Sequence, residues 1–288
     1  MKPSPFEYHR ASSIEDAIAA LATHGEGARL LAGGQSLIPM MNLGLATPDL
    51  LVDVGNLSDL RYVRVEDGIL RIGALATHNA IMGAGPSALA CPLLIVAYQS
   101  VAHHTIRNRG TLGGNICHAD PASEMPLVLT LLDASMVIRG ARGGRVVTAD
   151  NFFIDAFETQ VGPAEMLTEI RIPAQPAGEG YAFEEMSQRK GDFAIVSVGC
   201  RLSMREGRMT NVCFGLIGAG GRKRRMSVVE ARLEGAVPDD RLLADAAELA
   251  VMNADPSDDI HADAEYKLDL VRALSRRVLT DAARMAVK

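Results

Sequence analysis

The sequence predicts an α+β protein, built from two N-terminal α/β subdomains and a C-terminal domain of antiparallel sheet and helices. Its 288 residues exceed one average domain. Short apolar strands and capped helices come first, whereas later segments alternate in polarity, which indicates antiparallel sheet. A proline-rich stretch at residues 173–178 separates the last hairpin and helices from the rest. We therefore expect domains at residues 1–55, 56–175 and 178–288.

The N-terminal domain is predicted from one helix and a following βαβ unit. Ser13 is a typical N-cap for the first helix, and Gly25 is a typical end. The short apolar run Leu30–Ala32 indicates a buried strand. A helix from Ser36 and a second buried strand at Leu50–Val54 complete the unit.

The central domain is predicted to contain antiparallel sheet. Residues 62–66 and 69–72 alternate in polarity around Asp67-Gly68, which is a type I′ turn sequence. Helices are expected near residues 86–104 and 122–132, on either side of a glycine-rich turn at Gly110–Asn115. Further strands are expected at residues 136–139, 145–148 and 170–172.

The C-terminal domain is predicted to combine a hairpin with helices. The hairpin strands lie at residues 196–204 and 209–216, where the polarity alternates. Helices follow from Ser227 onward. In the last helix, apolar residues recur at helical spacing and should face the core: Leu268, Val271, Leu274 and Val278.

The composition does not favour a nucleic-acid-binding or membrane protein. Acidic residues outnumber basic residues by 35 to 29, so the net charge of −6 provides no basic field for nucleic acid. No apolar run approaches the roughly 20 residues of a transmembrane helix, and no apolar signal core precedes Ser13. We therefore expect a cytoplasmic protein without a transmembrane segment.

Two further features are interpreted as structural. The widely spaced cysteines lack CxxC spacing, which predicts reduced and mostly buried thiols rather than a zinc site, an iron–sulfur cluster or a disulfide framework. They are Cys91, Cys117, Cys200 and Cys213. The basic run at residues 222–225 has no interleaved aromatic residue, so we interpret it as a solvated turn or a partner contact.

Two Gly-Gly turns are the most informative features of the sequence. Gly33-Gly34 follows a buried strand, and Gly113-Gly114 follows a helical region. Without a Cβ at two successive positions, the backbone can adopt positive φ and bring its amides close to a ligand. Ser36 adds the start of a helix, which suits a phosphate. Two such loops could bind a diphosphate from opposite sides, and the alternative is that each is only a tight structural turn.

Other types of site receive less support from the sequence. Gly218-Ala219-Gly220 lacks the third glycine of a dinucleotide-binding fingerprint, and there is no P-loop. Gly34-Gln35-Ser36 is half of a nucleophile elbow, because Ile38 stands where the second glycine is needed. A group of possible metal ligands lacks the HExxH spacing of a metal hydrolase. This group contains His103, His104, His118, Asp120 and Glu124.

The combination of these motifs resembles the FAD-binding medium subunit of the xanthine oxidase and carbon monoxide dehydrogenase family of molybdenum hydroxylases. Three stretches carry the resemblance: Ala32–Pro39, Ile106–Asn115 and Gly191–Ala194. It extends over essentially the whole chain. The resemblance implies a PCMH-type FAD-binding fold in which FAD lies between the first two domains.

The resemblance also implies which loops hold FAD. The diphosphate and its neighbouring atoms would be bound by backbone amides together with the side chains of Ser36, Thr111 and Asn115. The first loop consists of Leu31, Ala32, Gly33, Gly34, Gln35, Ser36 and Leu37. The second loop consists of Thr111, Leu112, Gly113, Gly114 and Asn115.

Three single residues are matched to further FAD contacts. Glu124 matches a position where many relatives carry aspartate near the sugar or ribityl region. Leu167 matches an apolar position beside the flavin or adenine. Phe193 lies in a segment that resembles a loop near the isoalloxazine, where its ring could cover one face.

The function implied by the resemblance is electron transfer, so no catalytic acid or base and no metal site are expected in this chain. A large subunit with a molybdenum-pterin cofactor would oxidise the substrate, and a small subunit with 2Fe-2S clusters would carry the electrons to FAD. FAD would then reduce an external acceptor. The resemblance implies a dimer of heterotrimers that hydroxylates an N-heteroaromatic compound, as quinoline 2-oxidoreductase does. The alternatives are a carbon monoxide dehydrogenase medium subunit and a metal-dependent hydrolase.

Overall fold

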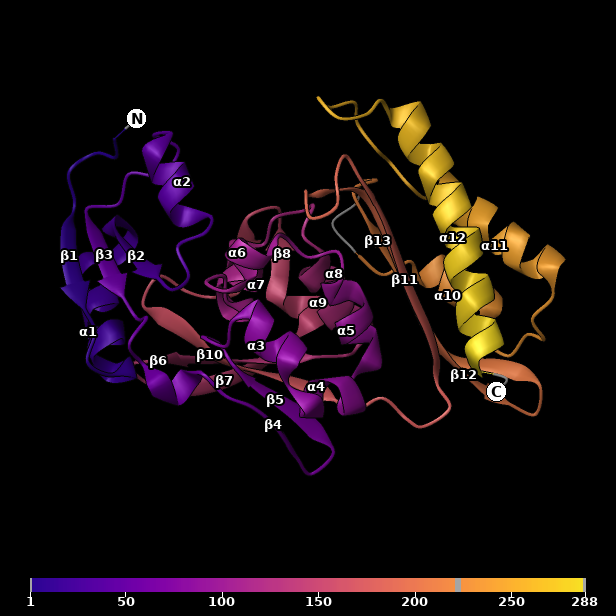
Figure 1. Ribbon diagram of the computed structural model, residues 1–288, viewed down its shortest axis with the longest axis horizontal. Helices are drawn as coiled ribbons and strands as arrows, with labels where there is room; N and C mark the ends of the chain where they lie inside the picture. Colours follow the sequence, from indigo (N-terminus) through magenta and orange to yellow (C-terminus); the bar gives the residue numbers. More distant parts are fainter. Residues whose placement is uncertain (1, 221–223, 287–288) are drawn as a thin grey trace. The chain divides into compact units, whose positions relative to one another are not determined.

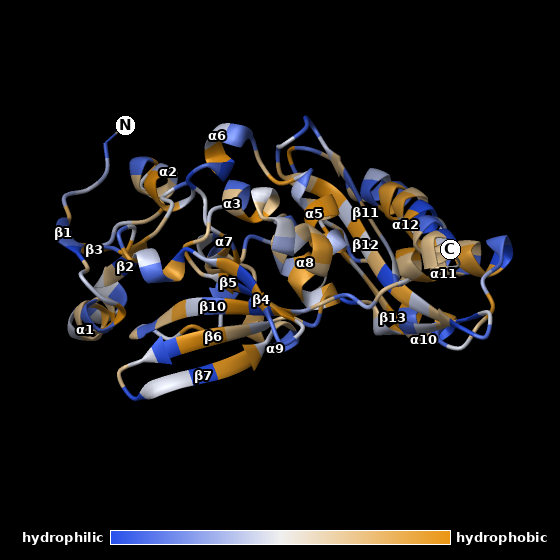
Figure 2. Ribbon diagram, turned by 60° about the horizontal axis from the view of Figure 1, so that its bottom comes forward, coloured by the Kyte–Doolittle hydropathy of each residue, from blue (hydrophilic) through white to orange (hydrophobic). Residues whose placement is uncertain are grey.

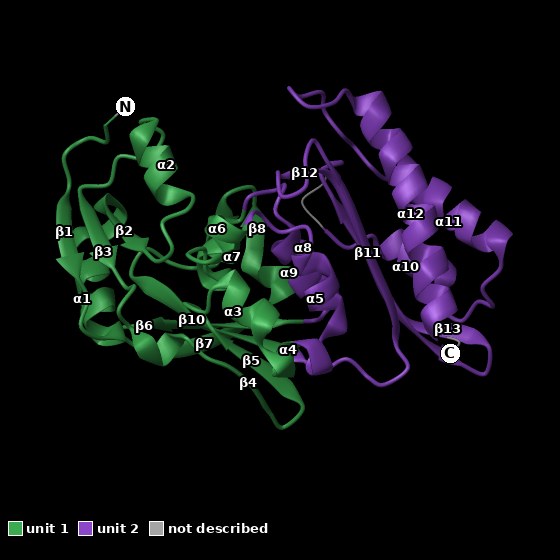
Figure 3. Cartoon of the chain, in the orientation of Figure 1, with its two compact units in different colours: residues 1–87, 104–119, 134–172 green, residues 88–103, 120–133, 173–288 purple. Residues whose placement is uncertain are grey.

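The computed structural model describes residues 2–220 and 224–286, and its contacts divide the chain into two compact units (Figures 1 and 3). Unit 1 comprises residues 1–87, 104–119 and 134–172. Unit 2 comprises residues 88–103, 120–133 and 173–288. The three expected domains remain a prediction. Each of the larger sheets draws its strands from only one of the expected ranges, whereas two helical segments of the expected central domain belong to unit 2.

Unit 1 begins with a small parallel sheet in the order β1-β3-β2 (Figure 1). Its strands are β1 (Glu7–Arg10), β2 (Ala28–Leu31) and β3 (Leu50–Asp53), and every neighbouring pair is parallel. Helix α1 (Ile14–His24) packs on β2 and β3, and α2 (Leu37–Asn42) connects these two strands. The expected βαβ unit is therefore confirmed. The sequence did not reveal β1, because it is an edge strand with mostly exposed residues.

A five-stranded sheet forms the second part of unit 1, in the order β4-β5-β10-β6-β7. Asp67 and Gly68 have φ values of 52° and 72°, so the expected type I′ turn is confirmed. Figure 2 shows that β6 and β10 are largely hydrophobic. Most residues of β10 are buried, whereas the buried residues of β6 are Met136 and Ile138. The strands are β4 (Val63–Glu66), β5 (Ile69–Gly73), β6 (Ser135–Gly140), β7 (Gly143–Thr148) and β10 (Glu165–Pro173).

Short elements complete unit 1. The helices are α3 (His78–Gly83), α6 (His104–Arg107), α7 (Leu112–His118) and α9 (Ala149–Phe152), with 3-10 turns η1 (Gly25–Gly27) and η2 (Ser58–Leu60). Strands β8 (Phe153–Asp155) and β9 (Glu158–Thr159) form a separate pair. The expected glycine-rich turn at Gly110–Asn115 differs from the structure, because its second half is the first turn of α7.

Unit 2 is built around an antiparallel sheet in the order β11-β12-β13. Its strands are β11 (Gly180–Ser187), β12 (Ala194–Arg205) and β13 (Arg208–Ile217). Helices α10 (Ser227–Leu233), α11 (Asp240–Met252) and α12 (Ala264–Ala286) lie on one face, and α5 (Pro92–Tyr98) and α8 (Glu124–Leu131) contact the sheet from the other (Figure 1). Helix α4 (Gly85–Ala90) spans the boundary between the units. The expected α+β fold class is confirmed.

The core of unit 2 follows the expected helical pattern with one exception. Val271, Leu274 and Val278 are buried in the cluster between α12 and the sheet. Leu268 is only half-buried, and Leu270 takes its place in the core. The cysteines are free, and all but the half-buried Cys117 are buried, as the spacing predicted.

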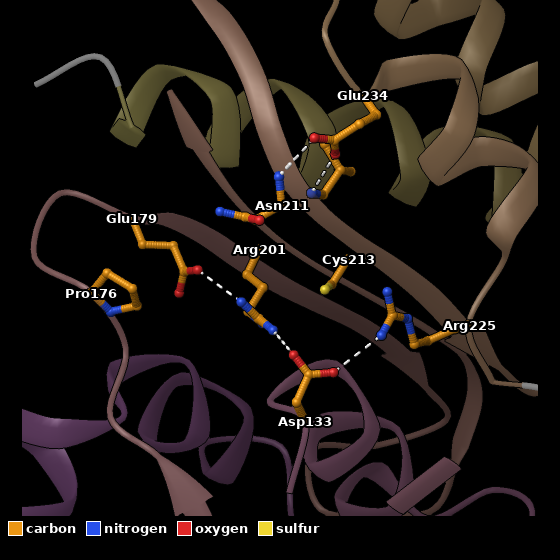
Figure 4. A pocket seen from close by; sticks show the side chains of 9 residues that line it. Asp133, Pro176, Glu179, Arg201, Asn211, Cys213, Arg225 and Glu234 are labelled. Atoms are coloured by element: carbon orange, nitrogen blue, oxygen red, sulfur yellow. Dashed lines mark hydrogen bonds and ion pairs between the residues drawn. The ribbon is translucent and has the colours of Figure 1, made fainter. Parts of the chain in front are cut away.

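An ion-pair network lines a polar cavity of about 350 Å³ in unit 2 (Figure 4). Arg201 donates hydrogen bonds to Asp133 and to Glu179, the latter at 2.9 Å. Arg225 donates to Asp133 at 3.2 Å and to Glu230 at 2.7 Å. Each of these charged side chains already has a partner of opposite charge. We therefore interpret the residues around the cavity as a structural ion-pair network rather than as a ligand site.

The same network changes the interpretation of the basic run. Arg225 is not in a solvated turn, because it pairs with Asp133 and Glu230. Burial lowers the pKa of Arg224 to about 10, so this residue is not fully solvated either. Arg222 and Lys223 lie outside the described residues.

Candidate functional site

A cavity of about 700 Å³ lies at the carboxyl ends of β2 and β3 in unit 1. Leu31 and Asp53 end these strands and are paired in the parallel register. The segments that follow the strands therefore start side by side, and ligands commonly bind at the carboxyl ends of parallel strands. The cavity is lined by Leu31, Ala32, Gly33, Gly34, Gln35, Ile38, Pro39, Asp53, Gly55, Asn56, Arg61, Leu75, Thr77, Asn108, Arg109 and Thr111.

The two glycine loops are in direct contact beside this cavity. A Cβ at Gly33 would collide with the carbonyl oxygen of Arg109, which lies two residues before the second loop. A Cβ at Gly114 would lie 4.0 Å from the Cβ of Ala32. The glycine at position 33 is therefore required by the approach of one backbone to the other.

The backbone N–H groups at residues 33–36 of the first loop are available to donate hydrogen bonds to a ligand; we call them open amides. Within the described part of the chain, no acceptor binds the N–H groups of residues 33–36. Gly34 has a φ of 72°, and Gln35 Nε2 donates to the carbonyl oxygen of Gly33 at 3.1 Å. Most N–H groups in folded proteins have partners, so a row of open ones beside a cavity favours an anionic ligand such as a diphosphate.

The N–H groups of residues 112–114 in the second loop already donate hydrogen bonds within the protein. This differs from the expectation that both loops offer their amides to a ligand. The N–H of Leu112 donates to the carbonyl of Ala76 at 3.1 Å, and that of Gly113 donates to Ala74 at 3.0 Å. The N–H of Gly114 donates to Thr111 Oγ1 at 3.1 Å, because Thr111 is the N-cap of α7. This loop can therefore offer the Thr111 hydroxyl proton to a ligand, but not its row of amides.

The structure brings only part of the expected site residues together. Leu31, Ala32, Gly33, Gly34, Gln35 and Thr111 line the cavity. Ser36 and Leu37 begin α2, and the Ser36 side chain makes no capping hydrogen bond. Leu112, Gly113 and Leu167 are buried in the packing of unit 1, and Gly114 and Asn115 lie on α7 outside the lining. Glu124 and Phe193 belong to unit 2.

The cavity also contains residues that the sequence did not reveal as site residues. Asp53 accepts hydrogen bonds from the Tyr8 hydroxyl and from the Gly55 N–H, the latter at 2.8 Å. Arg61 donates to the carbonyl oxygen of Gly55. A usable signal was the position of Asp53 at the end of a predicted buried strand, since polar residues at strand ends often line binding sites.

Glu124 is a buried carboxyl group at the start of α8. Burial raises its pKa to about 8, and the nearby carboxylates of Glu185 and Asp120 add to this shift. Glu185 is held by a hydrogen bond from Ser197 Oγ at 2.8 Å. At neutral pH Glu124 is therefore mainly protonated, so its carboxyl group can donate a hydrogen bond.

His78 supports the second loop from inside unit 1. Its backbone N–H donates to the carbonyl of Gly110 at 3.0 Å, and a Cβ at Gly110 would lie 3.0 Å from the imidazole. Burial, together with the charge of Arg107, lowers the pKa of His78 to about 4. The imidazole is therefore neutral at physiological pH and acts as a packing group.

The possible metal ligands noted in the sequence do not form a cluster among the described residues. Among residues 2–220 and 224–286, no group of three or more His, Cys, Asp or Glu side chains could hold a metal ion. The candidate ligands from the sequence are split between the units, with His118 in unit 1 and Asp120 and Glu124 in unit 2.

A helix that crosses a bilayer needs about 20 mostly apolar residues. In the described ranges, no helix combines the length and the apolar character that a membrane-spanning helix requires.

Comparisons with known proteins find similar chains over the full length. Residues 4–175 match the FAD binding domain in molybdopterin dehydrogenase, and residues 181–282 match the CO dehydrogenase flavoprotein C-terminal domain. Caffeine dehydrogenase subunit beta of Pseudomonas sp. strain CBB1 is 37% identical, with 98% of this chain and 96% of that chain covered. The carbon monoxide dehydrogenase medium chain of Afipia carboxidovorans is 36% identical, with 97% of both chains covered.

A solved structure supports the same likeness. Quinoline 2-oxidoreductase from Pseudomonas putida 86 superposes on this chain with a TM-score of 0.94 at 36% sequence identity, and 100% of both chains is covered.

We predict that Gly33→Ala weakens FAD binding by at least about tenfold and lowers the free energy of unfolding by about 1–3 kcal/mol, because the added Cβ pushes the two loops apart. Flavin fluorescence titration and thermal melting measure both effects. Gly83→Ala is the matched control, since a Cβ there meets no atom within 4 Å. If Gly33→Ala behaves like this control, the loop contact is not required.

A second prediction concerns the pH dependence of stability. The pKa of Glu124 is about 8 in the folded chain against 4.5 in the unfolded chain. Its contribution to stability is therefore complete below pH 4.5 and is lost as the pH rises toward 8. Glu124→Gln stays neutral, so the difference in melting temperature between variant and wild type should grow from near zero at pH 5 to several degrees at about pH 9.

This prediction is checked by thermal melts of the flavin-free chain across that pH range. The exposed Glu26 provides a matched control, and Glu26→Gln should show a constant difference from wild type. A Glu124→Gln protein whose difference is equally constant would contradict the raised pKa.

Proposed function

The chain belongs to the family of FAD-binding medium subunits of molybdenum hydroxylases, and we propose that its unit 1 cavity holds the diphosphate of FAD. The family predicted from the sequence motifs is thereby confirmed, and FAD is the cofactor of this chain. The chain is the flavoprotein subunit of a multi-subunit oxidoreductase. When bound, FAD accepts electrons and passes them to an external acceptor, while the protein binds and orients it.

The row of open amides at residues 33–36 carries the proposal for the diphosphate. Their N–H groups offer hydrogen bonds to phosphate oxygens, and the Thr111 hydroxyl lies in the lining of the same cavity. Gly33 lets this loop rest on the backbone at Arg109, so the amides are fixed before the ligand arrives.

Further contacts to FAD are proposed for the remaining site residues. Leu167 would contact the flavin or adenine through its apolar side chain. Glu124, as a neutral carboxyl group, would donate a hydrogen bond to the sugar or ribityl region. Phe193, which is 60% exposed between β11 and β12, would cover one face of the isoalloxazine.

The proposed partners are a small subunit with 2Fe-2S clusters and a large subunit with the molybdenum-pterin cofactor. The relatives named as a medium chain and as subunit beta support a complex of several subunits. We propose that the complex is a dimer of heterotrimers and works in the cytoplasm.

The proposed substrate class is the N-heteroaromatic compounds. Caffeine dehydrogenase and quinoline 2-oxidoreductase, which are relatives of this chain, are named for such substrates. A carbon monoxide dehydrogenase is the second candidate, because its medium chain is 36% identical to this chain. The substrate would be oxidised on the large subunit, so the residues of this chain do not choose between the two.

We predict that the purified chain is yellow, that acid releases FAD from it, and that it copurifies with the two partner subunits. The intact complex should reduce a dye with quinoline or caffeine as electron donor and not with carbon monoxide. Absorbance spectroscopy, mass measurement of the complex and dye-reduction assays provide the readouts. A colourless chain that cannot be reconstituted with FAD contradicts the proposed function, and dye reduction with carbon monoxide alone supports the second candidate.

A further inference from the structure

Arg61 brings a positive charge to the wall of the unit 1 cavity at the end formed by the turn after β3. It follows η2, and one guanidinium N–H is held by the carbonyl oxygen of Gly55. In the described ranges no carboxylate forms an ion pair with Arg61, whereas neighbouring Arg64 and Arg71 both pair with Glu66. The guanidinium is therefore positioned in the cavity but not neutralised.

Arg61 adds a full positive charge to a wall that also contains an acidic side chain. Asp53 is the acidic residue in the lining, and its carboxylate accepts hydrogen bonds from Tyr8 and Gly55. Asp53 also pairs with Arg10, with the Nε atom 3.8 Å from Oδ2, and its remaining negative charge would still disfavour a phosphate nearby. Open amides carry only partial charges, so the full positive charges in the lining, on Arg61 and on Arg109, offset this repulsion.

The chemistry of the side chain fits a phosphate. A guanidinium group is planar and always charged, and its paired N–H groups match two phosphate oxygens. Gly55 uses one N–H of Arg61 and fixes the group, which leaves other N–H groups for a ligand.

We propose that Arg61 binds the phosphate on the adenosine side of FAD and thereby makes the site selective for the dinucleotide over flavins without an AMP portion. The inference rests on the proposed function, in which the diphosphate lies at residues 33–36. Phe193, the residue proposed to cover the isoalloxazine, belongs to unit 2. The wall around Asp53 and Arg61 belongs entirely to unit 1, and we assign it to the AMP half of FAD.

The test compares Arg61→Gln with the control Arg64→Gln in the flavin-free full chain. Arg64 stacks on the ring of Tyr62 at 4.5 Å and does not line the cavity, so the control removes the same charge from a nearby position. Fluorescence titration gives the Kd of FAD and of riboflavin, and competition against FAD gives the Kd of ADP. Arg61→Lys, which keeps the positive charge but lacks the planar guanidinium group with its paired N–H groups, is measured in the same way.

Arg61→Gln should weaken FAD and ADP by about tenfold each, the effect of losing one charge-assisted hydrogen bond, and leave riboflavin unchanged. Arg64→Gln should bind all three like the wild type, and Arg61→Lys should fall between the wild type and Arg61→Gln. Unchanged binding of FAD to Arg61→Gln overturns the inference. Equal weakening of riboflavin and FAD also overturns it, because the effect would then not concern the AMP half. A wild-type chain that binds no FAD would instead refute the proposed function.

Discussion

The contact between Gly33 and the carbonyl of Arg109 is the constraint on which the rest of the candidate site depends. It joins the loop after β2 to the segment that leads into α7, although these are about 75 residues apart in the sequence. The loop after β2 cannot move toward the second loop without a backbone clash, and it starts beside the turn after β3 because the two strands are parallel. The cavity is the space bounded by these fixed segments.

The two glycine motifs have different roles in this arrangement. The second loop uses its amides within the protein, since Leu112 and Gly113 donate to the carbonyls of Ala76 and Ala74. That makes it a rigid support, further packed by the neutral His78. The first loop keeps the N–H groups of residues 33–36 for a ligand. In unit 1 the second loop therefore holds the first loop in position, and the first loop binds the ligand. Such a division is common in preorganised sites.

The local features could be predicted from the sequence, because short-range chemistry determines them. Asp67-Gly68 specified its hairpin turn, and Ser13 and Gly25 delimited α1. Features that depend on distant parts of the chain could not be predicted. The closing of the second loop requires the carbonyls of residues 74 and 76, and the role of Arg61 requires the turn at Gly55. The edge strand β1 gave no signal, because its exposed residues do not alternate in polarity.

The central claim is that the first loop donates its amide hydrogen bonds to FAD, whereas the second loop donates them within the protein. Amide hydrogen exchange of the full chain, with and without FAD, tests this claim most directly. Open amides exchange quickly until a ligand accepts their hydrogen bonds, whereas amides bonded within the fold exchange slowly. Residues 33–36 should therefore exchange quickly without FAD and become protected when it binds, while residues 112–115 should be protected in both states. The account would be contradicted if residues 33–36 gained no protection from FAD, or if residues 112–115 became protected only upon FAD binding.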